Sequence, residues 1–164
     1  MNYTKALQNP IFKIISQASQ DLNVDSYVIG GFVRDLILGR DFKKDIDVVA
    51  VGSGIELALA VSKLLPNKPK VQVFKTYGTA MLRYEDTEIE FVGARKESYH
   101  HESRNPVVEN GTLEDDQNRR DFTINALALS LNADNFGDLL DPFNGISDLE
   151  NKIIKTPLDP DITF

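Results

Sequence analysis

The stretch that decides the fold spans residues 27–51 and reads YVIGGFVRDLILGRDFKKDIDVVAV. Its first residues, Tyr27–Ile29, are aromatic or β-branched, which is typical of a buried strand. Gly30 and Gly31 interrupt this run, and apolar residues then recur at helical spacing until Gly39, a residue type that commonly ends helices. The pattern predicts a strand, a junction without side chains, a short helix and a second strand.

The glycine pair at this junction is suited to hold a phosphate group. Backbone N–H groups at a helix N-terminus lack intrahelical partners and carry partial positive charge, and glycines let an anion approach them closely. Arg34 lies in the first turn of the expected helix and can add a charge-assisted contact to the same anion. Gly30, Gly31 and Arg34 are therefore candidate phosphate-binding residues.

The second strand of the stretch carries two acids one residue apart, Asp45 and Asp47. The strand period of two places both on one face, with Cα atoms roughly 6.6 Å apart, and turns Ile46 to the other face. Two bare carboxylates at the start of an apolar strand repel each other, and a divalent cation removes that penalty. Mg²⁺ prefers a few carboxylates together with substrate phosphates. A phosphate cradle and an acid pair so close in the sequence indicate chemistry on a nucleoside triphosphate.

Composition and charge limit the classes of protein to consider. A chain of 164 residues, 41% of them hydrophobic, fits one domain with its own core. The absence of cysteine excludes a disulfide framework, a thiolate metal site and a cysteine nucleophile. The chain has no charged and then apolar leader and no run of apolar residues long enough to span a membrane, so we expect a soluble cytoplasmic protein.

The net charge of −7 is the opposite of what a protein that grips RNA by itself normally shows. Either the acids gather away from an RNA-binding surface, or something outside this chain holds the RNA.

The rest of the chain is expected to pack around this stretch as helices and strands. Apolar residues recur at helical spacing in two further segments, Pro10–Leu22 and Ile55–Leu65. From Lys70 the pattern changes to the alternation of strands, which are expected over Val71–Phe74, Ala80–Tyr84 and Glu88–Val92. In the last of these, Glu88 and Glu90 share a face, and the pattern alone makes them solvent-facing glutamates.

Two other segments are less informative. Gly52-Ser53-Gly54 precedes the second of these helices, and its amides leave a small anion site open as an alternative to a simple turn. Residues 96–116 show little periodicity and are expected to form a long loop, whose role the sequence does not indicate.

A second polar motif lies within an apolar run at residues 119–129, RRDFTINALAL. Asp121 is a good N-cap for a short helix that begins at Phe122 and buries its apolar residues. That reading does not explain the two arginines before the cap or Asn125 within the run. Guanidinium groups matched to phosphate oxygens, with an acid and an amide suited to ribose hydroxyls, explain both.

These motifs together resemble the signature of the tRNA nucleotidyltransferase and bacterial poly(A) polymerase family, the class II branch of the polymerase-β-like nucleotidyltransferases. Taken alone, a glycine pair is usually a turn and Asp-x-Asp is usually a solvated strand end, so the ordered combination carries the likeness. GGFVRD at residues 30–35, followed ten residues later by Asp45-Ile46-Asp47, matches the family's first motif without a gap. Residues 119–126 match its second motif, and the resemblance extends from Tyr27 to Asp148.

The resemblance implies roles for individual residues. The family's catalytic carboxylates, which hold two Mg²⁺ ions, match Asp45, Asp47 and Glu90. The residues expected to bind the nucleotide match Gly30, Gly31, Arg34, Arg120, Asp121 and Asn125. Among these, Arg120 is expected to contact a phosphate, and Asp121 and Asn125 are expected to face the sugar and select ribose over deoxyribose.

The resemblance also implies a fold and a reaction. The fold is expected to be a mixed α/β sheet of about five strands with helices mainly on one face, as in polymerase-β-like nucleotidyltransferases. The reaction is expected to transfer CMP or AMP from CTP or ATP to the 3′-hydroxyl of tRNA, with release of pyrophosphate. Residues 1–164 are expected to form the head of a longer enzyme whose neck, body and tail domains hold the tRNA, so that the isolated chain is weakly active or inactive.

The sequence leaves several alternatives open. The same head motifs occur in a poly(A) polymerase that adds AMP to RNA 3′ ends, and CCA-adding, CC-adding and A-adding enzymes cannot be separated because the family's base-reading motif is not in this chain. A hypothesis from another class is a non-catalytic nucleotide-binding module, which would not need Asp45 and Asp47. The oligomeric state is not indicated.

Overall fold

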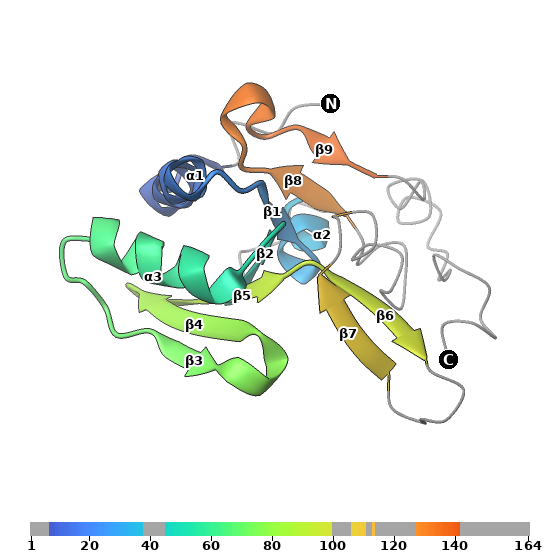
Figure 1. Ribbon diagram of the computed structural model, residues 1–164. Coiled ribbons are helices and arrows are strands. Elements are labelled where there is room, and N and C mark those ends of the chain that lie inside the picture. The colour runs from blue at the N-terminus through green and yellow to red at the C-terminus, as the bar shows by residue number, and fades with distance from the viewer. Residues whose placement is uncertain (1–6, 38–44, 100–105, 111–112, 114–126, 142–164) are drawn as a thin grey trace.

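The fold is a mixed seven-stranded sheet with helices packed against it, accompanied by a separate two-stranded sheet (Figure 1). The computed structural model describes residues 7–37, 45–99, 106–110, 113 and 127–141. The helices are α1 (Pro10–Leu22), α2 (Gly31–Ile37) and α3 (Gly54–Leu64), with short 3₁₀ helices η2 (Lys75–Tyr77) and η4 (Ala133–Asn135). The strands are β1 (Ser26–Ile29), β2 (Asp45–Ala50), β3 (Gln72–Phe74), β4 (Thr79–Tyr84), β5 (Thr87–Gly93), β6 (Arg95–Tyr99), β7 (Pro106–Asn110), β8 (Ala128–Ser130) and β9 (Leu139–Leu140).

The main sheet has the strand order β3-β4-β5-β2-β1-β8-β9. Strand β2 pairs antiparallel with β1 and parallel with β5, and the other neighbouring strands pair antiparallel. The crossover from β2 to β5 runs through α3 and the β3–β4 hairpin, as parallel neighbours require a long connection. This arrangement places β2 at the centre of the sheet.

The described helices contribute to one core on one face of the sheet, as the sequence predicted. The core joins α1 and α3 to alternate residues of the central strands, among them Val28, Val48 and Phe91. Phe32 of α2 packs on Phe12 of α1, with ring centroids 5.7 Å apart and planes at 45°. A smaller apolar cluster lies under the opposite face and consists of Tyr27, Ile29, Val49, Ala94, Leu113 and Ala128.

Helix α1 has the bounds that its sequence predicts. The side chain of Asn9 accepts a hydrogen bond from the Ile11 amide at 3.1 Å, and Pro10 occupies the first turn, where its missing N–H costs nothing. The helix ends at Asn23, which has the left-handed conformation (φ 56°) and whose amide donates to carbonyls of the last turn.

Helix α3 begins in close contact with the end of β5. Ser53 caps it by accepting from the Glu56 amide at 3.1 Å. A Cβ atom placed on Gly54 would lie 2.7–2.9 Å from backbone atoms of Phe91, Val92 and Gly93. The segment 52–54 therefore has a packing role that only glycine allows at position 54.

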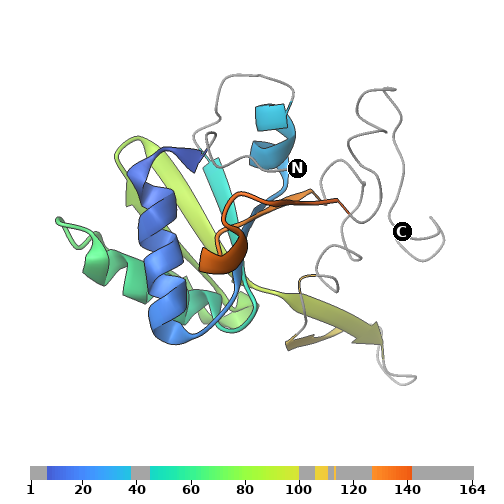
Figure 2. The same cartoon turned by 90° about the horizontal axis from the view of Figure 1, so that it is seen from above.

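The strand count and the segment after Arg95 differ from expectation. Seven strands form the main sheet instead of about five, because β8 and β9 are only three and two residues long and carry little periodic signal. The long loop expected over residues 96–116 is wrong in part, since β6 and β7 pair from Arg95↔Asn110 to Tyr99↔Pro106. This hairpin projects away from the main sheet, on the side opposite α1 and α3 (Figure 1 and Figure 2). A two-stranded ribbon outside the main sheet need not bury one face, so apolar and polar residues alternate only weakly along its sequence.

Among the helices that the structure describes, none has the length and apolar content needed to cross a membrane.

Replacing Gly54 with Ala should destabilise the fold by about 1–3 kcal/mol, because the new methyl group meets backbone atoms that cannot rotate away. Gly31→Ala is the matched control, since it also adds a methyl group at a helix start, where the nearest atom is the flexible Arg34 guanidinium at 3.4 Å. The control should stay within about 1 kcal/mol of the parent. Urea unfolding midpoints measure both variants, and equal midpoints for the two would contradict the packing role of Gly54.

Candidate active site

Strand pairing brings the glycine junction and the acids to the same end of the sheet. In the antiparallel pair β1–β2, Ile29 lies opposite Asp47, so the chain turns into Gly30 and Gly31 beside the start of β2. In the parallel pair β2–β5, Asp47 lies opposite Glu90. The predicted convergence of Gly30, Gly31, Asp45, Asp47 and Glu90 on one region is therefore supported by the backbone register.

The acids lie on the face of the sheet opposite the helices. Asp45 and Asp47 alternate with Ile46 and Val48, which are buried in the core beneath the helices. The next residue on the acid face, Val49, belongs to the smaller apolar cluster. Asp45 is exposed, and Asp47 and Glu90 are partly buried. The acids thus stand at the solvent end of an otherwise apolar face.

Glu88 adds a fourth carboxylate to this face. It lies opposite Asp45 in the same parallel pairing and is exposed. The strand alternation places Glu88 and Glu90 together, as the sequence predicted, and the pairing with β2 sets them beside the two aspartates. Each acid of β2 therefore has an acid of β5 as its neighbour, and a cation would relieve the repulsion among them.

The two glycines serve different needs at the junction. Gly30 has φ 85°, a conformation that favours glycine, and its amide donates to the Leu127 carbonyl at 3.3 Å. This amide is therefore engaged by a hydrogen bond within the protein. At Gly31 a Cβ atom would lie 3.4 Å from Nη2 of Arg34, so the guanidinium folds back over this glycine. Phosphate binding by Gly30, Gly31 and Arg34 stays a prediction.

Arg34 is held in place by its neighbour Asp35. The Arg34 Nε donates to Asp35 Oδ1 at 3.3 Å, and the Asp35 side chain is only 2% exposed. A buried carboxylate next to an arginine limits the rotamers of the guanidinium and orients it. Asp35 belongs to the GGFVRD motif, but no role was predicted for it. The sequence feature that could have indicated this role is an acid on the apolar side of a short helix.

Asn132, which follows β8, holds the start of β1 through hydrogen bonds. The Asn132 side chain accepts from the Ser26 amide at 2.9 Å and also hydrogen bonds to the Tyr27 hydroxyl. Burial raises the pKa of Tyr27 above its usual value, partly offset by the bond to Asn132. Tyr27 lies on the same face of the sheet as the acids, paired with Val49 of β2.

Three of the predicted nucleotide-binding residues, Arg120, Asp121 and Asn125, lie outside the described residues. The first described residue after them is Leu127, which is fully buried and accepts from Gly30. Leu127, which directly follows the second motif in the sequence, therefore contacts Gly30 of the first motif. The predicted burial of Leu127 and Leu129 is confirmed, although Leu129 belongs to strand β8.

The donor set fits Mg²⁺ by chemistry and by register, since Asp45, Asp47 and Glu90 offer carboxylate oxygens from adjacent strand positions. Within the described ranges, no three His, Asp or Glu side chains are already gathered as a metal centre. The assignment of these three residues as ligands of two ions stays a prediction.

Comparison with known proteins gives a consistent result. The family model described as the poly A polymerase head domain matches residues 26–155. An A-adding tRNA nucleotidyltransferase of Aquifex aeolicus is 41% identical over 130 residues, which cover 79% of this chain and 15% of that protein.

Solved structures of the same kind share the fold. A CCA-adding enzyme in its apo form II has a TM-score of 0.85 and 34% identity, covering 96% of this chain and 38% of that one. A tRNA nucleotidyltransferase complexed with a primer tRNA and an incoming ATP analog has a TM-score of 0.76 and 35% identity, covering 88% of this chain and 39% of that one. The chain thus spans well under half the length of each protein it matches here.

Magnesium should raise the midpoint temperature of thermal unfolding. The acids of β2 and β5 lie side by side only in the folded state, so a cation that they bind stabilises that state. At a concentration ten times Kd, the gain is about 1.4 kcal/mol. Differential scanning calorimetry with and without MgCl₂ measures it. Asp47→Asn should lose the shift, whereas Asp21→Asn, an exposed acid on α1, should keep it. An undiminished shift in Asp47→Asn would remove that residue from the metal site.

Proposed function

Because this chain belongs to the family of poly A polymerase head domains, we propose that it is the catalytic head of a template-independent RNA nucleotidyltransferase. The enzyme that contains it transfers CMP or AMP from CTP or ATP to the 3′-hydroxyl of a tRNA and releases pyrophosphate. The relatives that carry this proposal are named as tRNA nucleotidyltransferases, and one was solved with a primer tRNA and an ATP analog.

The observation that best supports this function is the register of β2. It sets Asp47 between Ile29, which leads into the glycine junction, and Glu90. A triphosphate that lies along this end of the sheet would meet Arg34 at one end and carboxylates further along. A module that only bound nucleotide would need the glycines and Arg34 but not three acids in register across two strands.

Each group has a role in the transfer. Arg34, oriented by Asp35, holds the β- and γ-phosphates, and the carboxylates of Asp45, Asp47 and Glu90 would hold two Mg²⁺ ions. Mg²⁺ at these carboxylates would supply a lower pKa for the attacking hydroxyl and positive charge opposite the departing pyrophosphate. The RNA 3′ oxygen gives its proton to water and forms a bond to the α-phosphorus as the bond to the bridging oxygen breaks, and the electron pair of that bond leaves with pyrophosphate. This in-line geometry needs the hydroxyl and the leaving group on opposite sides of the phosphorus.

The second motif supplies the sugar-facing contacts in this proposal. Arg120 adds a phosphate contact, and Asp121 and Asn125 bind the ribose hydroxyls. These roles rest on the match of residues 119–126 to the family motif and on the meeting of Leu127 with Gly30.

A poly(A) polymerase is the second candidate, favoured by the description of the matching family model. The experiment that tests the proposal and separates the two gives the full-length enzyme a tRNA without its 3′ end, Mg²⁺ and each triphosphate in turn. Addition of a short, defined C or A sequence supports the tRNA enzyme. A long A tract on any RNA supports the polymerase, and no incorporation contradicts both.

Asp45→Ala or Asp47→Ala in the full-length enzyme should lower nucleotide incorporation by at least about 10³-fold, because loss of a metal ligand removes several kcal/mol of transition-state stabilisation. Single-turnover addition to radiolabelled tRNA measures the rate. The control is Glu56→Gln, an exposed carboxylate on α3 on the other side of the sheet, which should keep the parent rate. Near-normal turnover in either aspartate variant would refute the assignment.

Asp121→Ala should relax the rejection of deoxynucleotides, because the site loses the acceptor matched to a ribose hydroxyl. The ratio of kcat/KM for ATP to that for dATP should fall about tenfold or more, since an unmatched buried hydrogen bond costs about 1–3 kcal/mol. Unchanged discrimination with parental activity on ATP would exclude Asp121 from sugar recognition.

A further inference from the structure

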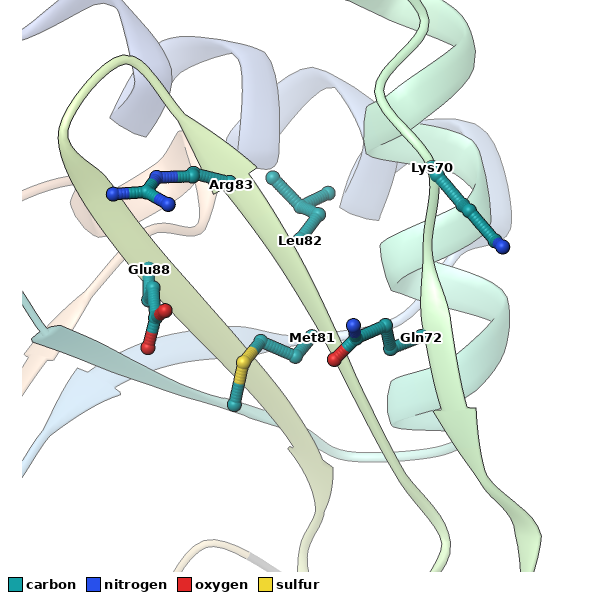
Figure 3. Close-up of a pocket in the computed structure, with 6 residues that line it drawn as sticks. All are labelled: Lys70, Gln72, Met81, Leu82, Arg83 and Glu88. Atoms are coloured by element: carbon teal, nitrogen blue, oxygen red, sulfur yellow. The ribbon is translucent and has the colours of Figure 1, made fainter.

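A pocket of about 180 Å³ lies beside the acids, where β3 separates from β4 (Figure 3). It is lined by Lys70, Gln72, Met81, Leu82, Arg83 and Glu88. The β3–β4 pairing ends at Gln72↔Met81, so the segment that leads into β3 leaves the sheet and opens space beside Arg83. The pocket is therefore a product of the short length of β3.

The pocket and the acids share one face of the sheet. Across β4–β5, Met81 lies opposite Glu90 and Arg83 lies opposite Glu88. Since Asp47 in turn lies opposite Glu90, one continuous row of residues joins the pocket to the acids. Strand spacing puts β4 about 10 Å from β2, so the pocket is a neighbour of the acid site on the side away from the glycine junction.

Five of the six pocket-lining residues come from a basic segment of the chain, and the sixth, Glu88, is acidic. Residues 57–84 contain five basic side chains and no Asp or Glu, in a chain of net charge −7. Lys70 and Arg83, which line the pocket, are exposed. Among the residues that the structure describes, neither forms an ion pair. The pocket therefore presents two positive charges to an anionic ligand against the single carboxylate of Glu88.

Exposed aromatic residues continue the surface along the sheet edge. Phe74 of β3 is 45% exposed and Tyr77 of η2 is 67% exposed. The strand period places Phe74 on the same face as Gln72, and therefore on the face that carries the acids. Cations beside exposed aromatic rings are the combination that binds single-stranded nucleic acid, by phosphate contacts and base stacking.

The proposed reaction indicates which phosphates Lys70 and Arg83 would contact. The leaving pyrophosphate lies at the glycine junction and Arg34, on the β1 side of the acids, so in-line attack brings the RNA 3′-hydroxyl from the β5 side. A strand that reaches Glu90 from that side crosses β4 and β3. We propose, on the basis of the function above, that Lys70 and Arg83 bind backbone phosphates of the RNA strand being extended, and that Phe74 stacks on one of its bases.

The test uses the full-length enzyme and compares Lys70→Glu, Arg83→Glu and Phe74→Ala with the matched charge reversal Lys13→Glu, an exposed lysine on α1. Each charge reversal in the pocket should raise KM for the RNA about tenfold and reduce the slope of log affinity against log salt by about 1. Phe74→Ala should raise KM for the RNA by about fivefold or more without changing the salt slope. KM for CTP and ATP should stay within about twofold in all variants, as should every value for Lys13→Glu.

Anisotropy of a labelled RNA gives binding without turnover, and thermal midpoints check folding. If a charge reversal lowers the midpoint, Lys70→Gln and Arg83→Gln replace it. A raised KM for nucleotide with unchanged RNA binding would assign the pocket to the triphosphate or to pyrophosphate and overturn the proposal. Equal losses in Lys13→Glu would also overturn it. If the parent adds no nucleotide, the proposed function fails, whereas an active parent with unaltered RNA binding in all variants contradicts the pocket inference alone.

Discussion

Strand β2 is held between an antiparallel and a parallel partner, and this pairing determines what the rest of the structure can do. The antiparallel pairing returns the chain from the glycine junction so that Asp47 lies beside Ile29. The parallel pairing brings the start of β5 to the start of β2, so that Glu90 meets Asp47. A slip of one residue in either pairing would turn the acids into the helix-covered core and Ile46 into solvent. The apolar residues of β2 therefore secure the position of its acids.

The two faces of the sheet divide the work of stability and chemistry. The face beneath α1 and α3 carries the large core, whose central strand residues are fully buried. The other face is apolar only in part, with Ile29, Val49 and Ala128 packed together and the acids beyond them. Concentrating like charges at one end of a face has a cost in repulsion, and the large core on the opposite face can bear that cost without loss of the fold.

Much of this could be predicted from the sequence because local signals and tertiary packing agree. Helix α1 was predicted to the residue, since Pro10 suits its first turn and its apolar face is regular. The alternation in β2 and β5 predicted which acids share a face. The family resemblance predicted that Glu90 lies beside the two aspartates, and the pairing of Glu90 with Asp47 agrees with it. The hairpin β6–β7 and the short strands β8 and β9 gave too little periodicity. The bond from the Gly30 amide to Leu127 joins residues far apart in the chain, and no local pattern could reveal it.

Strand β3 is an outermost strand of the main sheet, and Val73 and Phe74 on it are 37% and 45% exposed. An open edge with apolar side chains is a template on which another extended chain can add, which leads to aggregation. Here the edge is three residues long and is flanked by Lys70 and Lys75, which act as charged gatekeepers. Lys70 and Lys75 therefore help to keep the protein soluble, independently of the RNA contact proposed for Lys70. A change that neutralised both without a compensating charge would leave the edge open to self-association.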